Sequence, residues 1–134
     1  MPLTITVTSF SFKKTPLVDS GGHGGGHVFD CRALPNPGRE DQYKKQTGRD
    51  QPVIEYLGQI DVVKEFITLT QQLVRISVQN YLSRGFDHLA VSFGCTGGQH
   101  RSVYCAERMR GWLQQEFGQA VVVQLHHRDC PVFD

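Results

Sequence analysis

An apolar segment that runs into a glycine-rich turn and then into a helical pattern restricts this chain to few folds. Residues 86–93 are mostly apolar and of strand length, and three glycines lie in the turn at 94–98. Residues 99–117 have helical spacing, Gly118 closes that helix, and residues 120–125 form another apolar strand. A strand, loop, helix and strand in this order predict a parallel pair joined by a right-handed crossover.

The remaining segments supply elements of the same two kinds. Residues 3–12 alternate apolar with Thr and Ser, which predicts a half-buried strand, and 28–34 predict a short strand ended by two prolines. A short helix from Pro52 to Gly58 precedes a long helix over 62–82. The apolar stripe of the long helix, together with Trp112, is expected to be core. Its members are Val62, Val63, Phe66, Ile67, Leu69, Leu73, Ile76, Val78, Tyr81 and Leu82.

Two connecting segments are expected to be surface loops. Five glycines lie in 21–26, which indicates a loop that is either a mobile lid or a flexible connector. His23 lies within this loop and His27 follows it, but His-x3-His places both rings on one face only in a helix, so we expect no metal site. Residues 38–51 are polar and predict a long surface excursion.

Together these elements predict a single α/β domain over residues 1–134, with a mixed or mostly parallel sheet flanked by helices. The charge balance of 14 Lys and Arg against 13 Asp and Glu argues against binding of nucleic acid or membranes through the overall field. No apolar stretch is long enough to span a bilayer, and no secretory signal is visible. We therefore expect a cytoplasmic protein without membrane partners, whose four cysteines are reduced thiols.

The turn between the strand and the helix carries most of the chemistry. Glycines there let backbone N–H groups converge, and a helix N-terminus adds partial positive charge, so a phosphate or carboxylate is the expected ligand. The lysine of a Walker A loop is missing. The candidate ligand-binding residues of this turn are Thr96, Gly97, Gly98, Gln99, His100, Arg101 and Ser102.

Two other interpretations of the turn stay open. The first is a plain glycine turn whose Arg101 and His100 face water. The second is a cysteine-dependent phosphatase, because Cys95 and Arg101 have the Cys-x5-Arg-Ser spacing of such enzymes, with Asp129 as the candidate general acid. A small buried cysteine that ends its strand is the simpler interpretation of Cys95, so we predict no catalytic residue and no cofactor.

Several motifs in order resemble the C-terminal domain of the RapZ family of RNase adapter proteins. Residues 9–13 are similar to the SFGFK opening of the family, 28–37 to its VFDVRFLPNP and 47–53 to its TGLDxPV. Residues 94–104 are similar to its GCTGG[KQ]HRSVY, and 127–128 to a closing HR. The resemblance covers nearly the whole chain.

The resemblance implies an α/β domain that binds glucosamine-6-phosphate, an amino-sugar phosphate, together with small regulatory RNA. By motif, the turn would hold the phosphorylated ligand, and five further residues would line or support the same pocket. These are Lys13, Asp30, Arg32, His127 and Arg128. An RNA-processing protein is an alternative partner to RNA, and an oligomer is left open.

The chain also departs from the family pattern. Full-length members begin with a nucleotide-binding P-loop domain, whereas only eight residues precede Ser9 here, so a stand-alone module is expected. Seven basic residues of the first half could form an RNA-binding patch, or a solvated surface of mixed charge. They are Lys13, Lys14, Arg32, Arg39, Lys44, Lys45 and Arg49. The sequence thus predicts a regulatory module that binds a phosphorylated metabolite without transforming it.

Overall fold

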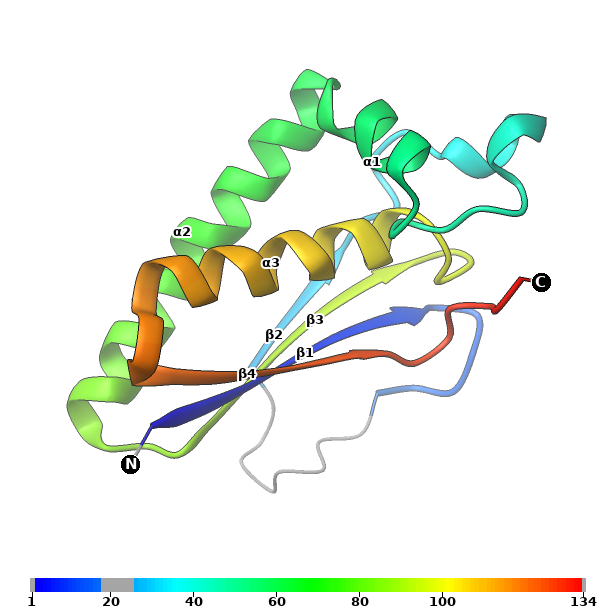
Figure 1. Cartoon of the computed structure of the whole chain (residues 1–134). Coiled ribbons are helices and arrows are strands. Elements are labelled where there is room, and N and C mark those ends of the chain that lie inside the picture. The colour runs from blue at the N-terminus through cyan, green and yellow to red at the C-terminus, as the bar shows by residue number, and fades with distance from the viewer. Residues whose placement is uncertain (1, 18–25, 134) are drawn as a thin grey trace.

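A four-stranded sheet with helices on one side forms the body of the molecule (Figure 1). The computed structural model describes residues 2–17 and 26–133. The strands are β1 (Leu3–Ser11), β2 (Gly26–Asp30), β3 (His88–Cys95) and β4 (Val121–His127). They lie in the order β2-β3-β1-β4, and every pairing is parallel. The predicted single α/β domain with a mostly parallel sheet is confirmed.

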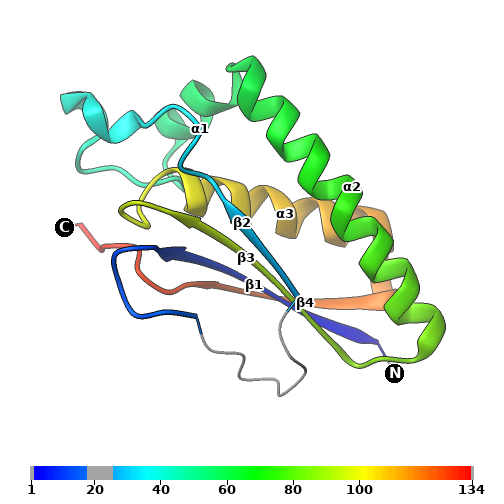
Figure 2. The same ribbon diagram turned by 180° about the vertical axis from the view of Figure 1, so that it is seen from behind.

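Three α-helices lie on the same side of this sheet in both views (Figure 2). They are α1 (Gln51–Gly58), α2 (Asp61–Arg84) and α3 (Arg101–Phe117), accompanied by the short 3-10 turns η1 (Pro37–Arg39), η2 (Asp41–Tyr43) and η3 (Gly118–Ala120). Helix α2 is capped at its C-terminus by Gly85, whose φ of 71° is the left-handed geometry that glycine adopts without strain. Among the described residues, no helix is both long and apolar enough to cross a bilayer.

The core lies between the sheet and the helices. Leu3, Ile5 and Val7 of β1 are fully buried, whereas the alternate threonines of the same strand are only half-buried. Met109 and Leu113 of α3 belong to the same buried cluster. The period of two along β1 therefore separates a helix-facing side of the sheet from a more polar outer side.

Strand boundaries and neighbours differ from the sequence prediction at two places. Strand β2 ends at Asp30, not at residue 34, because the Asp30 carboxylate accepts a hydrogen bond from Arg32 N at 2.9 Å and turns the chain. Strands β3 and β4 are parallel but are not neighbours, since β1 lies between them. The predicted loop at 21–26 and His23 lie outside the described residues, except that Gly26 opens β2.

The prediction that the whole apolar stripe of α2 is core was wrong. The buried face of α2 consists of Val63, Ile67, Thr70, Val74 and Val78. Val62, Leu69, Leu73 and Ile76 are 47–66% exposed. Apolar residues cover a wider arc of this helix than the arc that meets α3 and the sheet, so one flank remains in solvent. Phe66, Tyr81 and Trp112 are partly buried against the core.

Candidate functional site

The carboxyl ends of the parallel strands gather the candidate residues at one edge of the sheet. Strands β1, β2, β3 and β4 end there at Ser11, Asp30, Cys95 and His127, beside η1, η2 and the C-terminal segment (Figure 1). Ligands of α/β proteins bind at this edge, because loops from several strands meet there.

The turn after β3 curls around the sulfur of Cys95. Gly98 N donates to Cys95 Sγ at 3.3 Å, and Cys95 Sγ lies 3.2 Å from Ser102 Oγ. Gly98 has a φ of 70°, and Ser11 Oγ donates to the Thr96 carbonyl at 2.6 Å. Cys95 is 2% exposed and Ser102 is buried, so both side chains shape the loop and do not line its open side.

Arg101, the first residue of α3, is a buried cation. It is 6% exposed, and its Nη1 donates to the carbonyls of Arg32 at 2.9 Å and Leu34 at 3.0 Å. Its Nε is buried without a hydrogen-bond partner, and among the described residues no ion pair includes it. A buried guanidinium without a directly paired carboxylate at a helix N-terminus concentrates positive charge at this turn.

His100 and Gln99 point away from the open side of the turn. His100 Nε2 lies 2.8 Å from the Tyr43 carbonyl, and Gln99 Nε2 donates to the carbonyls of Lys44 and Gln46 at 2.8 Å. These contacts fasten the 38–51 excursion to the turn. Burial lowers the pKa of His100 below its ordinary value, against the opposing effect of its hydrogen bond to the Tyr43 carbonyl.

This lowered pKa of His100 predicts a loss of stability in mild acid. The folded state favours neutral His100, so its contribution is complete above the ordinary pKa of 6.5 and is lost as pH falls toward the lower folded value. We expect the free energy of unfolding in urea to change less between pH 7.5 and pH 5.5 for His100→Gln than for the wild type. His126→Gln, at an exposed position, serves as the control and should keep the wild-type dependence.

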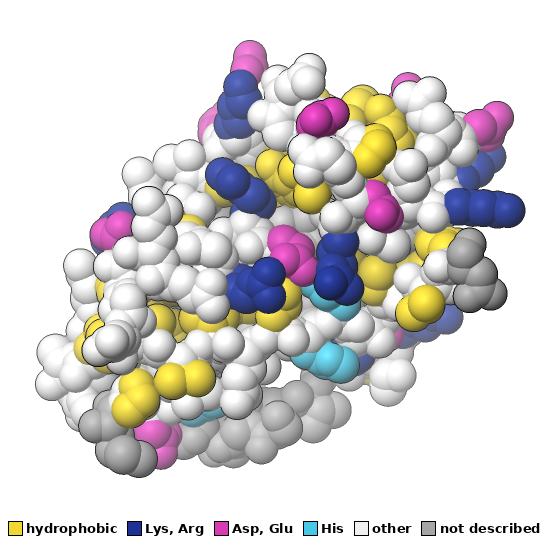
Figure 3. All heavy atoms as spheres, in the orientation of Figure 1, with side chains coloured by type: hydrophobic (Ala, Val, Ile, Leu, Met, Phe, Trp, Pro, Cys, Tyr) yellow, Lys and Arg dark blue, Asp and Glu magenta, His cyan; other side chains and the backbone are white. Residues whose placement is uncertain are grey.

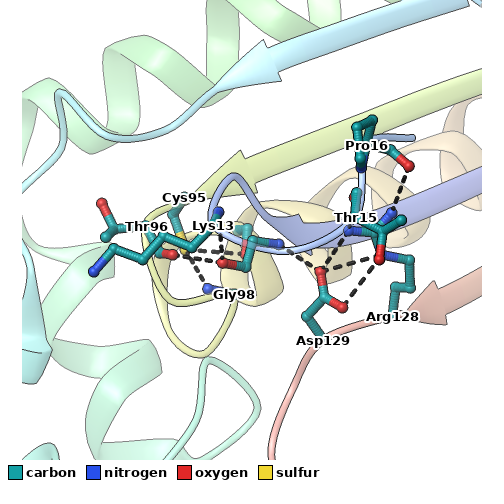
Figure 4. Close-up of polar contacts among 10 residues, drawn as sticks. Lys13, Thr15, Pro16, Cys95, Thr96, Gly98, Arg128 and Asp129 are labelled. Atoms are coloured by element: carbon teal, nitrogen blue, oxygen red, sulfur yellow. Dashed lines mark hydrogen bonds and ion pairs between the residues drawn. The ribbon is translucent and has the colours of Figure 1, made fainter.

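Lys13, Thr96 and Gly97 lie on the solvent side of the turn. In Figure 4 the side chains of Lys13 and Thr96 extend in the same direction, away from Arg128 and Asp129. Gly97 is exposed, with nothing within 4 Å of the place where a Cβ would lie, and Thr96 is half-buried. The backbone of Gly97 and the hydroxyl group of Thr96 are therefore accessible beside Lys13.

Asp30 and Arg32 form an exposed ion pair at the end of β2. Arg32 Nη2 lies 2.7 Å from Asp30 Oδ2, and the hydrogen bonds from Arg32 hold the pKa of Asp30 below its usual range. The Arg32 guanidinium also lies over the Phe12 ring, 4.1 Å from its centroid. This pair is joined to the turn through the Arg32 carbonyl, which accepts from Arg101.

Arg128 and Asp129 form a second ion pair, which holds the segment after β1. Arg128 Nη2 lies 2.9 Å from Asp129 Oδ2, and the guanidinium donates to the carbonyls of Thr15 and Pro16 (Figure 4). Asp129 Oδ2 accepts from Ser11 N at 2.7 Å. Burial raises the pKa of Asp129, but the hydrogen bonds from Arg128 and Ser11 outweigh it and lower the net value. Asp129 is thus ionised near neutral pH.

His127 belongs to a chain of side chains that the sequence did not indicate. Its Nδ1 lies 2.7 Å from Ser9 Oγ, and its Nε2 lies 2.8 Å from Glu107 Oε2. Glu107 also pairs with Arg110 at 2.9 Å and with Arg49 at 3.5 Å. Figure 3 shows side chains of both charges beside histidines on the face of the molecule that it draws. Ser9 is fully buried, so this arrangement orients the imidazole and offers no accessible nucleophile.

A cavity of about 470 Å³ borders His127 and is lined mainly by Thr47, Arg49, Asp50 and Cys130. Within the part of the chain that the structure describes, residues 96–102 line neither this cavity nor a smaller apolar one beside Phe10. The structure thus brings Lys13, Thr96 and Gly97 together on one open surface. It places His100, Gln99 and Arg128 in supporting contacts instead.

Three of the seven basic residues of the first half lie in ion pairs. Arg32, Lys44 and Arg49 each pair with a carboxylate, of Asp30, Asp41 and Glu107 respectively. Neutralisation by these partners favours the solvated surface of mixed charge that the sequence left as the alternative. All four cysteines are free thiols, as expected.

Comparison with known proteins gives consistent matches over most of the chain. A family model described as the RapZ C-terminal domain matches residues 3–131. The chain is 40% identical over 127 residues to a nucleotide-binding protein of Clostridium acetobutylicum, and this match covers 95% of the chain and 40% of the relative. It is 38% identical to a nucleotide-binding protein of Caldicellulosiruptor bescii, and this match covers 95% of the chain and 41% of the relative. It is 37% identical to a nucleotide-binding protein of Staphylococcus epidermidis, and this match covers 96% of the chain and 40% of the relative. The chain spans about two-fifths of the length of these curated relatives.

Proposed function

Since the chain belongs to the RapZ C-terminal domain family, we propose that it is a regulatory module that binds a phosphorylated small molecule at the turn between β3 and α3. The ligand class is an amino-sugar phosphate such as glucosamine-6-phosphate. Its phosphate lies against Thr96, Gly97 and the N-terminus of α3, with Lys13 beside it. Names of relatives as nucleotide-binding proteins agree with a ligand that carries phosphate.

Arg101 is the observation on which this proposal rests. Its charge is buried at the first residue of α3, its Nε has no hydrogen-bond partner, and its contacts are carbonyls and not a carboxylate. Burial of a charge that has no direct ion-pair partner costs free energy, and a bound anion offsets that cost. Arg101 therefore stabilises a phosphate at the turn even without a direct contact. Because Arg101 also contacts residues 32–34, ligand binding is linked to the position of that segment.

We propose binding without catalysis. Cys95 is 2% exposed and lies against Ser102, and Asp129 is ionised, whereas a cysteine-dependent phosphatase needs an accessible thiolate and a protonated acid. Ligand binding then acts by shifting the population of conformations that a partner recognises. RNA or an RNA-processing protein is the partner class that the family suggests.

Titration calorimetry with glucosamine-6-phosphate tests the proposal on the wild type and on Thr96→Val. Valine has nearly the shape of threonine but lacks the hydroxyl, and a hydrogen bond to a charged group contributes about 1.5–3 kcal/mol. Affinity should fall about tenfold to a hundredfold. Thr68→Val, at an exposed position on α2, is the matched control and should bind like the wild type.

Glucosamine and inorganic phosphate, titrated separately, define which part of the ligand is recognised. We expect weak binding of phosphate and none of the free amino sugar. Equal affinity of the wild type and Thr96→Val for glucosamine-6-phosphate, or no binding to either, would contradict the proposal. Hydrolysis of an aryl phosphate by the wild type that is absent in Cys95→Ser would show an enzyme instead.

A further inference from the structure

A second hollow lies at the carboxyl end of β1, on the side of the sheet that faces away from the helices. It has a volume of about 370 Å³ and is lined chiefly by Phe10, Phe12, Pro16, Leu17 and Val28, with Lys14 as its cation. Val28 is 57% exposed although it lies in a strand. The volume falls within the range of small-molecule sites, about 300–1,000 Å³, which are likewise mostly apolar with few polar groups.

The floor of this hollow is an aromatic pair that rests on a glycine. Phe10 and Phe12 lie edge to face with ring centroids 4.8 Å apart. A Cβ on Gly94, the neighbour of Phe10 in β3, would lie 2.5 Å from Phe10 Cζ and 2.5 Å from Phe12 Cε2. Only glycine at this position lets both rings lie against the sheet, so residue 94 sets the depth of the hollow.

The wall formed by residues 14–17 is fastened by ionic contacts. Arg128 donates to the carbonyls of Thr15 and Pro16, and Asp129 fixes both Arg128 and Ser11 N (Figure 4). The wall thus has a defined position relative to the aromatic floor, and the hollow is formed before any ligand arrives.

One cation, Lys14, lines the hollow beside its aromatic surface. The Arg32 guanidinium lies over the Phe12 ring, 4.1 Å from its centroid, but it is paired with Asp30 and does not line the hollow. Aromatic side chains favour a flat aromatic ring, and an ammonium group favours an anion next to it. An aliphatic group would gain burial here but would give Lys14 no anionic partner.

We propose that this hollow binds a nucleoside monophosphate, with the base against Phe10, Phe12 and Val28 and the phosphate beside Lys14. Base stacking on aromatic side chains contributes about 1–3 kcal/mol and does not require a particular base. The site is separate from the turn at residues 96–101, none of which lines the hollow. It can therefore be occupied together with the ligand of that turn.

Titration of the full chain with adenosine 5′-monophosphate tests this proposal. Val28→Trp fills the hollow and should weaken binding at least tenfold, and Phe12→Leu, which removes the ring and keeps the apolar volume, should also weaken it. Val122→Trp is the matched control, since Val122 is similarly exposed on the same outer side of the sheet but lies far along β4, opposite Thr4. Its affinity should stay within twofold of the wild type.

Adenosine should bind more weakly than the monophosphate, and ribose 5-phosphate should not bind. Three results would overturn the proposal. They are ribose 5-phosphate that binds as tightly as the monophosphate, a single-stranded oligonucleotide that binds when the monophosphate does not, and Val28→Trp with the affinity of the wild type. Glucosamine-6-phosphate binding should be unchanged in Val28→Trp, and monophosphate binding unchanged in Thr96→Val, so failure at one site is distinguishable from failure at the other.

Discussion

Replacement of Gly48 by alanine is expected to destabilise the protein by about 3 kcal/mol or more. A Cβ at this position would lie under 3.0 Å from His100 O and Tyr104 N, which are backbone atoms of the first turn of α3 and cannot move aside. Gly48 N also donates to the Gln99 carbonyl at 3.0 Å. The added methyl group would separate the excursion of residues 38–51 from the turn that it covers.

Chemical denaturation of the wild type and of Gly48→Ala measures the difference in their free energies of unfolding. Gly111→Ala is the matched control, because Gly111 lies within α3 and a Cβ there meets nothing within 4 Å. Alanine in a helix is better than glycine by about 0.5–1 kcal/mol, so this variant should be more stable than the wild type. A Gly48→Ala protein as stable as the wild type would mean that the excursion is not held closely against α3.

Replacement of Arg101 by methionine should abolish the stabilisation of the protein by glucosamine-6-phosphate. A ligand at a hundred times its Kd stabilises a folded protein by about 2.7 kcal/mol, and the variant should show none of this gain. Loss of the guanidinium also leaves the carbonyls of Arg32 and Leu34 without their donor, at a cost of about 1–3 kcal/mol each.

Thermal unfolding with and without ligand separates these two effects. Arg108→Met, at an exposed position of the same helix, should keep both the wild-type midpoint and its shift with ligand. Arg101→Lys retains the charge but cannot reach both carbonyls in the same geometry, so it should keep part of the shift. A full ligand shift in Arg101→Met would show that the anion binds elsewhere.

Periodicity within one segment predicted the elements well, because it depends on residues that are close in sequence. The strand at β1, the helices α1, α2 and α3, and the turn around Cys95 were all indicated by apolar spacing and by glycines. Periodicity did not show that β1 separates β3 from β4, since the order of strands depends on contacts between distant segments.

The same limit applies to the candidate site. His100 was expected to face a ligand, but its partner is the Tyr43 carbonyl, 57 residues away in the sequence. The contacts of His127 with Ser9 and Glu107 likewise join three separate elements, and no local spacing indicates them. In α2 the sequence predicted too much burial. A hydrophobic pattern identifies residues that are able to be buried, but it does not show which of them pack against a neighbouring element.

The position of β1 in the middle of the sheet has a consequence for biosynthesis. Residues 3–11 are translated before the other strands and the helices of this domain, yet they pair only with residues 88–95 and 121–127. Leu3, Ile5 and Val7 have no strand to pair with until β3 has been translated, and one edge of β1 stays open until β4 emerges. We expect the nascent domain to hold an unpaired apolar strand until residues 88–95 have been translated, which makes it a natural client of ribosome-associated chaperones.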